Sequence, residues 1–521
     1  MNRNKMISLL ENQADRPWDL IIIGGGATGL GCAVDAVTRG YKTLLLEKSD
    51  FAKGTSSRST KLVHGGVRYM AQGDIFLVME ALAERGRLLK NAPYLTENQE
   101  FVIPVYSLFD VVLYTVGLKF YDILSGRLSL GKSYFINKDR TLQRLPNLKP
   151  GGLKGGIVYH DGQFDDSRMA LALARAAAEN GGVILNYFGV TSLVKDDKGK
   201  LEGVCATDSV NGKNYCLKAK AVINATGVFA DDILHLDNPA AHRTIRPSQG
   251  VHVVLDRSFL AGDSAIMIPK TDDGRVLFAI PWYDKVVAGT TDTPLEKISD
   301  EPKALDEEVN FILRTASRYL VKAPSEKDIL CVFAGLRPLA ADPDNPQSTK
   351  EISRRHKIIV SDSGLLTITG GKWTTYRCMA EEAIDKLIGT GKLEKQKCIT
   401  KNFHLGGNIE HAEDDRLRIY GKGAGEILSL INEHPGLDEP LSVSFKYTRA
   451  EIAWICRNEM AVTIEDVLAR RTRALLLDAR ECEKMAPVVA SIMAAELGHD
   501  NKWIDKELEN FSILVKNYIR D

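Results

Sequence analysis

The sequence predicts an α/β protein that ends in an all-α domain, and two observations support this. Near the start, a strand in "DLIIIGGG" (19–26), a helix in "ATGLGCAVDAVTRG" (27–40) and a strand in "KTLLLEK" (42–48) form a βαβ pattern. From "TRAEIAWICRNEM" (448–460) onward the chain reads as amphipathic helix with few strand signals. We therefore expect an α/β region over 1–400 and a helical C-terminal domain over 401–521.

Size and charge narrow the class of protein. The 521 residues are too many for one hydrophobic core, so we expect two or three domains. Lys plus Arg and Asp plus Glu both number 68, which gives a formal net charge of zero. This balance excludes a global basic field for binding nucleic acid.

The eight cysteines carry no metal or redox signature. None forms a CxxC pair, and no histidine pair has zinc-ligand spacing. We expect buried, reduced thiols in a cytosolic chain, and no bound metal.

The N-terminal 20 residues contain no apolar stretch long enough for a signal peptide, and no apolar run is long enough for a transmembrane helix. The nearest approach is "VYSLFDVVLYTVGLKFYDIL" (105–124), which Asp110, Lys119 and Asp122 interrupt. We favour a core helix here; the alternative is a helix at a membrane surface.

A glycine-rich turn between the first strand and the first helix predicts a dinucleotide site. Gly24, Gly26 and Gly29 form G-x-G-x-x-G with Thr28 inside it, so no Cβ keeps a pyrophosphate from the helix N-terminus. Glu47 ends the next strand, where a carboxylate accepts from a ribose hydroxyl. The pattern is typical of a Rossmann-type domain that binds an adenine dinucleotide.

The polar loop "GTSSRSTKLVHGGVRYM" (54–70) begins within ten residues of Glu47 and must lie beside the same ligand. NAD folds usually continue directly into another βα unit, whereas a long polar loop suits the longer FAD. The candidate cofactor contacts in the loop are Thr55, Ser56, Ser57, Lys61, Leu62 and His64.

Two later segments agree with FAD. The strand in "VINATGVFAD" (222–231) would return the chain to the nucleotide, with Gly227 allowing close packing. In "ITGGKWTTY" (368–376) a strand and a glycine pair precede a helix, whose N-terminus would stabilise the negative charge of a reduced flavin. The contacts expected there are Gly371, Lys372 and Thr374.

Together these motifs resemble a known family, the FAD-dependent, respiratory, quinone-linked glycerol-3-phosphate dehydrogenases. The resemblance covers nearly the whole chain. It implies a discontinuous FAD-binding Rossmann-type domain of the glutathione-reductase and amino-acid-oxidase kind, a mixed-sheet substrate domain and an all-α C-terminal domain. The matching stretches are the βαβ unit, the 54–70 loop, "YHDGQFDDSRMALALARAA", "INATGVFADD", "IPWYDKVVAGTTDT", "GLRPL", "TGGKWTTYR" and "EDVLARRTRALLLDA".

The resemblance also implies a reaction and its partners. Glycerol 3-phosphate would be oxidised at C2 to dihydroxyacetone phosphate, with the hydride going to FAD and the electrons to a membrane quinone. We accordingly expect a homodimer in the cytoplasm, bound peripherally to the inner face of the cell membrane.

A phosphate dianion requires clustered cations, with arginine best suited to bidentate contacts. The candidates are Arg68, Arg337, Arg354 and Lys372, and Arg355 rivals Arg354. Tyr69 follows Arg68 and matches the Arg-Tyr pair that faces the substrate in the family.

Oxidation of an alcohol requires a base for the hydroxyl proton, a role that suits histidine near neutral pH. His252, in "SQGVHVVLD", matches the active-site histidine of the family, whereas we expect His64 to contact FAD. Lys372 could share the role of base, because neighbouring cations lower the pKa of a lysine. The predicted catalytic set is His252, Arg337 and Lys372.

Two further polar turns have weaker signals. "GTTDT" (289–293) is either a capped turn or support for the site through Thr290, Thr291 and Asp292. In "YHDGQFDDSR" (159–168), Asp165 or Asp166 caps a helix, and we expect no chemistry there.

Three alternatives remain open at this point. One is an oxidase that performs the same half-reaction with O2 and releases H2O2. Another is an amino-acid or amine-oxidising flavoenzyme of the same fold. The last is a flavin-binding or partner-binding protein without turnover. The helical C-terminal domain could be a lid, a dimer interface or a membrane contact.

Overall fold

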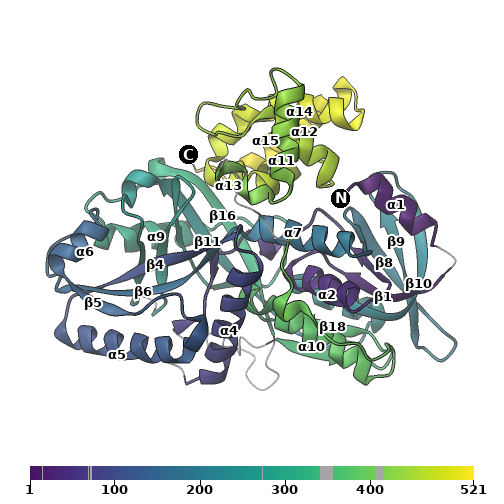
Figure 1. Cartoon of the computed structure of the whole chain (residues 1–521), viewed down its shortest axis with the longest axis horizontal. Helices are drawn as coiled ribbons and strands as arrows, with labels where there is room; N and C mark the ends of the chain where they lie inside the picture. Colours follow the sequence, from purple (N-terminus) through teal and green to yellow (C-terminus); the bar gives the residue numbers. More distant parts are fainter. Residues whose placement is uncertain are drawn as a thin grey trace.

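The computed structural model describes residues 1–13, 16–67, 70, 73–272, 274–340, 356–406 and 415–520. Two β-sheets with helices packed around them lie side by side, and a cluster of helices from the C-terminal end of the chain covers the junction between them (Figure 1). This is the α/β fold with a helical C-terminal domain that the sequence predicts.

The first sheet contains the predicted βαβ unit. Its central strands are parallel; Ile21 pairs with Val222 on one side and with Leu44 on the other. Both faces of this sheet are covered, which explains the continuous apolar run at residues 20–23. The strand order is β17 (Lys357–Val360), β18 (Leu366–Thr369), β10 (Asn214–Asn224), β1 (Trp18–Ile23), β2 (Thr43–Leu46) and β7 (Val183–Leu185), with β8 (Phe188–Lys195) and β9 (Leu201–Asp208) extending β10.

The helices beside this sheet come from distant parts of the chain. The G-x-G-x-x-G helix is α2, and it packs against α10, which lies some 350 residues later. The first sheet and its core are therefore complete only when the segment near residue 366 joins the N-terminal unit. These helices are α1 (Arg3–Glu11), α2 (Ala27–Thr38), α7 (Asp166–Glu179), α8 (Ala230–Asp237) and α10 (Tyr376–Gly389).

The second sheet is mostly antiparallel and has a core of its own. Its main path runs β15 (Thr293–Pro294), β11 (Ile245–Asp256), β14 (Lys285–Gly289), β13 (Leu277–Trp282), β12 (Ala265–Ile268), β4 (Thr96–Val105), β6 (Gly155–Phe164) and β3 (Leu62–Val63). β16 (Ile329–Ala340) pairs with β11, and β5 (Tyr134–Asn137) pairs with β6. The helices around it are α4 (Ile75–Asn91), α5 (Leu108–Ser125), α6 (Lys138–Arg144) and α9 (Asp306–Tyr319).

The C-terminal helices form a third core, which also includes side chains from β11, β14 and β16. They lie above the junction of the two sheets in Figure 1. Their elements are α11 (Gly423–Glu433), α12 (Arg449–Asn458), the π-helix η9 (Asp466–Arg471), α13 (Ala474–Leu477), α14 (Ala479–Leu497) and α15 (Asn501–Val515).

Helix α5 corrects one prediction. We favoured a core helix over 105–124, but α5 buries only Leu118, Tyr121 and Ser125. Its outer face is exposed and apolar, along the lower edge of Figure 1. None of the helices in the described part of the chain combines the length and the apolarity needed to cross a bilayer. The most exposed side chains of this face are Leu108 at 75%, Phe109 at 72%, Val112 at 63%, Val116 at 64% and Ile123 at 73%.

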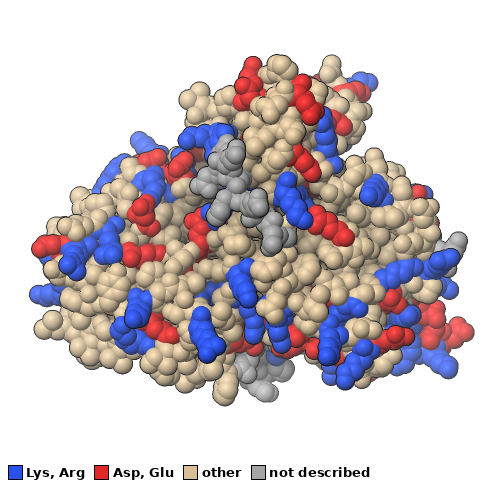
Figure 2. Space-filling view, in the orientation of Figure 1, with Lys and Arg blue, Asp and Glu red and all other residues tan. Residues whose placement is uncertain are grey.

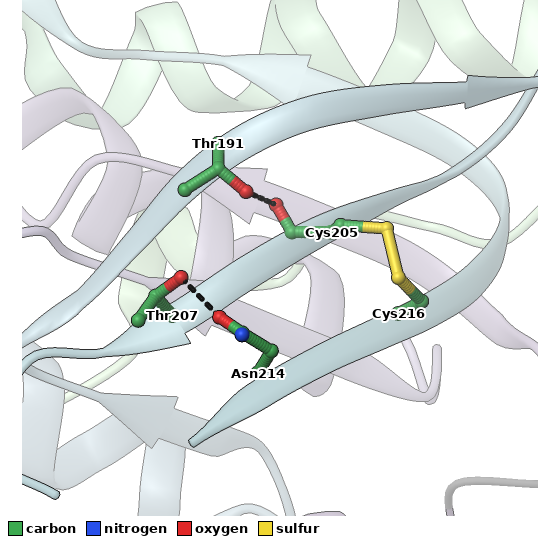
Figure 3. The surroundings of a disulfide bond; sticks show 5 residues. All are labelled: Thr191, Cys205, Thr207, Asn214 and Cys216. Atoms are coloured by element: carbon green, nitrogen blue, oxygen red, sulfur yellow. Dashed lines mark hydrogen bonds between the residues drawn. A yellow bond between two sulfur atoms is a disulfide. The ribbon is translucent and has the colours of Figure 1, made fainter. Parts of the chain in front are cut away.

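A disulfide corrects a second prediction. Cys205 and Cys216 are bonded rather than reduced, and they face each other across the antiparallel pair β9–β10 (Figure 3). The two residues are 11 positions apart, and the strand register brings them opposite each other. A thiol pair matched by register leaves no local sequence motif, which is why the search for CxxC missed it.

Charges of both signs are distributed over the surface. On the face shown in Figure 2, Lys and Arg side chains alternate with Asp and Glu side chains. This face carries no extended field of one sign, in agreement with the balanced composition.

Candidate active site

A cavity of about 630 Å3 follows the carboxyl ends of the parallel strands β1, β10 and β18 and extends to β11 and β16. Ligands of open α/β sheets bind at this edge. The cavity brings together most of the predicted site residues, from six separate segments of the chain. Those that line it are Gly24, Gly26, Thr28, Glu47, Thr55, Ser56, Leu62, His64, Gly227, His252, Arg337, Gly371, Lys372 and Thr374.

The glycine turn is shaped by close contacts between backbones. Gly24 has φ +109°, and a Cβ there would lie 2.6 Å from the carbonyl oxygen of Ala225. At Gly29 a Cβ would lie 1.9 Å from the carbonyl oxygen of Gly24, so Gly29 packs behind the turn. Helix α2 begins at Ala27, whose N–H donates to Ser56 Oγ, and the other N–H groups of its first turn lie at the cavity beside Gly26.

Glu47 follows β2 and is held by backbone donors. The N–H of Gly25 donates to Glu47 Oε2 at 2.6 Å, and the N–H of Ser49 donates to Oε1 at 2.8 Å. Burial raises the pKa of Glu47, and these two hydrogen bonds oppose the increase. Each carboxylate oxygen keeps a second lone pair that can accept from a ligand hydroxyl.

The polar loop is fixed on both sides of the cavity. Ser56 Oγ accepts from the N–H of Ala27 at 2.9 Å, and Trp373 Nε1 donates to the Ser56 carbonyl at 2.9 Å. The Thr55 hydroxyl donates to the carbonyl of Leu336. Most of the hydroxyl groups in "GTSSRST" therefore serve to hold the loop around its ligand.

Two predicted contacts of the loop do not reach the cavity. Lys61 is fully buried, and its Nζ lies 2.8 Å from Asp166 Oδ2 and donates to the carbonyl of Ser57 at 2.7 Å. Asp165, rather than Asp166, caps helix α7 by accepting from the N–H of Arg168. Lys61, Ser57 and Asp166 thus form a buried cluster beneath the loop.

Two glycines from later in the chain, Gly227 and Gly371, also line the cavity. Gly227, with φ +62°, follows β10, and Gly371, with φ +76°, follows β18. A Cβ at Gly371 would lie 2.4 Å from Met379 Sδ. A short helical turn at Trp373–Thr375 leads into α10, as the sequence predicts, and Lys372 begins this turn at the cavity wall.

His252 lies on β11, between β14 and β16 in the second sheet, and is 2% exposed. Its Nε2 is 2.9 Å from Thr60 Oγ1, and its ring stacks on Phe333 with centroids 4.9 Å apart. No described side chain or backbone group hydrogen-bonds its Nδ1. Burial, followed by the charges of Arg337 and Lys61, holds the pKa of His252 well below its ordinary value. The ring is therefore neutral and can accept a proton.

Arg337 lies on β16, where it pairs with Ser248 of β11. Its charge acts on His252, which lies further along β11. Its guanidinium donates to Thr290 Oγ1 at 3.0 Å and to Asp292 Oδ1 at 3.3 Å. A Cβ at Gly250 would lie 2.3 Å from Arg337 Nη2, so glycine leaves space for the guanidinium.

The "GTTDT" turn supports strand β11 and the guanidinium of Arg337. Thr291 Oγ1 accepts from the N–H of Val251 at 2.9 Å and donates to Glu308 Oε1 at 2.7 Å. Asp292 and Thr290 hold the guanidinium of Arg337. The structure therefore gives this turn the supporting arrangement that the sequence left open.

A second cavity, of about 190 Å3, adjoins the first. Arg337, Thr60, Leu62 and His64 line both cavities. Arg275 also lines the smaller one, and the sequence analysis missed it. Its position near the "GTTDT" turn follows from the β13–β14 register, in which Phe278 pairs with Gly289, and no local motif marks it. Arg68, Tyr69 and Arg354, with its rival Arg355, lie outside the described residues.

The described part of the chain holds one group of side chains near enough to share a metal ion. Ligand atoms of Glu80, Cys378 and Glu382 lie within 4.8 Å of one another, and His356 Nε2 is 2.8 Å from Glu382 Oε2. Exposed carboxylates often group in this way without an ion, so we assign no metal to it.

Comparison with known proteins defines the class. A family model described as FAD dependent oxidoreductase matches residues 19–377. A second model, described as C-terminal domain of alpha-glycerophosphate oxidase, matches residues 367–504. The fold and the cavity are therefore those of a FAD-dependent oxidoreductase.

Relatives that match nearly the whole of this chain narrow the assignment. The chain is 40% identical over 542 residues to "Probable glycerol-3-phosphate dehydrogenase, mitochondrial" of Dictyostelium discoideum, covering 96% of this chain and 84% of the relative. It is 38% identical over 543 residues to human "Glycerol-3-phosphate dehydrogenase, mitochondrial", covering 98% and 74%. The chain belongs to the FAD-dependent glycerol-3-phosphate dehydrogenase family.

Solved structures agree with this assignment. Glycerol-3-phosphate dehydrogenase from Bacillus halodurans complexed with FAD superimposes with a TM-score of 0.81 at 29% identity, covering 99% of this chain and 98% of that one. L-alpha-glycerophosphate oxidase from Mycoplasma pneumoniae shares the fold, with a TM-score of 0.56 at 20% identity over 72% and 95%.

FAD is the cofactor of this chain, and the larger cavity fits it. The glycine turn leaves the N-terminus of α2 open to a pyrophosphate, and Glu47 lies where a ribose hydroxyl would donate. The far end of the cavity reaches His252 and Arg337, beside the Gly371–Lys372 turn.

Proposed function

We propose that this chain oxidises sn-glycerol 3-phosphate to dihydroxyacetone phosphate and passes the electrons to a membrane quinone. One observation carries the proposal: the neutral His252 and the cationic Arg337 lie together where the cofactor cavity meets the smaller cavity. A phosphorylated secondary alcohol requires this pairing of a base with an anion-binding group.

The smaller cavity suits the phosphate end of the substrate. Arg337 and Arg275 both line it, and Thr290 and Thr291 contribute hydroxyl groups. Two guanidinium groups can meet a phosphate dianion with charge-assisted, bidentate hydrogen bonds. We propose that Arg68, Tyr69 and Arg354 complete this phosphate site and that Lys372 approaches it from the cofactor side.

His252 is the proposed base for the hydroxyl proton. Its lowered pKa keeps the ring neutral, and Thr60 and Phe333 fix the ring plane. FAD, when bound, supplies the acceptor for the hydride that leaves C2. We further propose that the residues lining the larger cavity contact FAD, whereas Gly29, Ser57 and Lys61 support those contacts from behind.

An exposed apolar surface supports a membrane acceptor. We call this surface the α4–α5 face; patches of this kind mark interaction sites on soluble proteins. The exposed Lys119 and Arg127 lie on or beside it and would attract anionic lipids. The α4–α5 face consists of Ile75, Phe76, Met79, Leu108, Phe109, Val112, Leu113, Val116, Phe120 and Ile123.

The α4–α5 face lies close to the proposed site of chemistry. Tyr121 of α5 accepts from the N–H of Gly65, and a Cβ at Gly65 would lie 2.5 Å from Leu82 of α4. Gly65 directly follows His64, which lines the cofactor cavity. Helices α4 and α5 would therefore lie between a quinone at a membrane on this face and the cavity. We propose peripheral binding to the inner face of the cell membrane, by a homodimer.

A second candidate keeps the same substrate but uses O2 as the acceptor. The observation that favours it is the match of residues 367–504 to the C-terminal domain of alpha-glycerophosphate oxidase. The two candidates differ in oxygen uptake. Rapid H2O2 production without membranes or dyes would favour the oxidase.

The purified protein with bound FAD provides the direct test. We expect glycerol 3-phosphate, added without oxygen, to bleach the visible flavin spectrum rapidly. A flavin that stays oxidised would contradict the proposal, and bleaching by D-amino acids instead would indicate the amine-oxidising alternative.

A further inference from the structure

The segment that wraps the cofactor cavity has a second side, which faces the C-terminal helices. We call residues 47–60 the cofactor loop; most of them line the larger cavity. Asp50 does not. It is fully buried on the opposite side of the loop, and its neighbours Ser49 and Ala52 line the cavity. Any group that holds Asp50 therefore also sets the path of the loop around FAD.

Asp50 is held by two consecutive arginines of the C-terminal domain. Arg470 Nε lies 2.5 Å from Asp50 Oδ2, and Arg471 Nη2 lies 2.9 Å from Oδ1. Asn186 Nδ2 donates to the same Oδ1 at 3.2 Å. Burial raises the pKa of Asp50, but the two guanidinium groups more than compensate, so the carboxylate remains ionised.

Two further residues of the cofactor loop, Lys53 and Arg58, also contact the C-terminal domain. Lys53 Nζ lies 2.7 Å from Glu465 Oε2, and Arg58 Nη2 lies 3.0 Å from the hydroxyl of Tyr518. Arg470 and Lys53 lower the pKa of Glu465 to about 2 against the effect of its burial. Residues 465–518 thus hold the cofactor loop at three points along its length.

The backbone that presents these arginines is unusual. Residues 466–471 form a π-helix, a conformation that is rare and common at functional sites. Arg473 follows with φ +61°, in the left-handed region that a non-glycine residue rarely occupies. In an ordinary α-helix neighbouring side chains point about 100° apart, whereas here Arg470 and Arg471 converge on one carboxylate.

We propose that the helical C-terminal domain is part of the FAD site. Arg470 and Arg471, through Asp50, and Glu465, through Lys53, are positioning residues that hold the cofactor loop in its FAD-binding path. Buried ion pairs are costly to desolvate and add little net stability compared with apolar packing. Because several buried ion pairs lie behind this loop, we infer that they fix the path of the loop rather than stabilise the protein as a whole.

The test measures FAD affinity rather than turnover. Apo-protein made from Glu465→Gln and Arg471→Met is titrated with FAD, and flavin fluorescence gives the dissociation constant. The matched control is Glu496→Gln, which removes a similar charge from an ion pair with Arg457 (2.6 Å) inside the C-terminal domain. We expect Glu465→Gln to raise the FAD Kd about tenfold, as loss of a charged contact does. Arg471→Met should raise it further, and Glu496→Gln should leave it unchanged.

Lys53→Met completes a double-mutant cycle with Glu465→Gln. Lys53 itself lines the cavity, so the comparison is with Lys53→Met: if Glu465 acts through Lys53, adding Glu465→Gln to Lys53→Met should weaken FAD binding no further. Should Arg471→Met fail to fold, Glu465→Gln and its control Glu496→Gln still test the proposal. Unchanged FAD affinity in Glu465→Gln would overturn the proposal. So would an equal loss in Glu496→Gln, because the effect would then reflect general stability.

Discussion

Thr60 Oγ1 lies 2.9 Å from Nε2 of His252 and joins the end of the cofactor loop to the strand that carries the proposed base. A hydroxyl can donate or accept, so Thr60 can support either form of the neutral ring. The contact means that the loop around the cofactor cavity also orients the proposed base.

Replacing Thr60 with valine tests this contact. Thr60→Val keeps the shape of the side chain and removes the hydroxyl, so the ring of His252 loses its orientation. We expect the rate of flavin reduction at saturating substrate to fall about tenfold, because small displacements of a catalytic group are costly. KM should change little. Thr60→Ser, which restores the hydroxyl, should recover the rate; no recovery would indicate a packing effect instead.

The lowered pKa of His252 predicts how activity depends on pH. An unperturbed histidine titrates near pH 6.5, but burial and the charge of Arg337 keep this ring neutral further into acid. In stopped-flow measurements, flavin reduction should stay level from about pH 8 to about pH 6. A fall with an apparent pKa near 6.5 would contradict the assignment.

The same shift affects stability. Because the folded chain binds this proton less readily than the unfolded chain, His252 lowers the free energy of unfolding as pH falls through about 6.5. Above that range it contributes no pH dependence. Denaturant titrations of His252→Gln should lack this component.

Arg275 should contribute to phosphate recognition. We expect Arg275→Met to raise KM for glycerol 3-phosphate by roughly ten- to a hundredfold, the range for a lost hydrogen bond between charged groups. Steady-state kinetics measures this directly. Arg314→Met, an exposed arginine near Asp272, is the matched control and should have no effect.

The α4–α5 face should bind lipid. Val116→Glu places a charge in the centre of the exposed side of α5, and charges are expelled from apolar membrane interiors. We expect this variant to lose co-flotation with vesicles containing anionic phospholipid. Val443→Glu, at a fully exposed valine of the C-terminal domain, should float like the parent protein. Equal flotation of both variants would exclude this face.

The Cys205–Cys216 disulfide should stabilise the β9–β10 hairpin locally. Closing a loop of this length is worth about 2–3 kcal/mol in the chain-entropy model. Hydrogen exchange of the hairpin amides should accelerate after reduction, or in Cys205→Ser, while FAD affinity stays constant because neither cysteine lines the cavity. Free thiols in the untreated protein would show that the bond does not form.

Local motifs predict the first sheet and much of the cofactor cavity because their physical requirements are local. A strand, a glycine turn and a helix N-terminus lie next to one another in sequence, and Glu47 has a fixed offset from them. Contacts set by pairing over long distances were missed. Lys61 pairs with Asp166, which lies 105 residues away in the sequence. The disulfide and the position of Arg275 depend on strand register.

Helix α5 shows that composition alone does not predict which helices are buried. Its composition is that of a buried helix, and a sequence shows how apolar a helix is but not whether a neighbour covers it. Only the packing of Tyr121 and Leu118 shows which side faces inward.

The wide separation of β1 from β18 and α10 has a consequence for synthesis on the ribosome. At about 5–20 residues per second, the roughly 300 residues between the cofactor loop and α10 take on the order of 15–60 s to add. During that time the growing chain exposes half of a nucleotide pocket. Arg470 and Arg471 emerge later still, so the contacts that set the path of the cofactor loop can form only as translation ends.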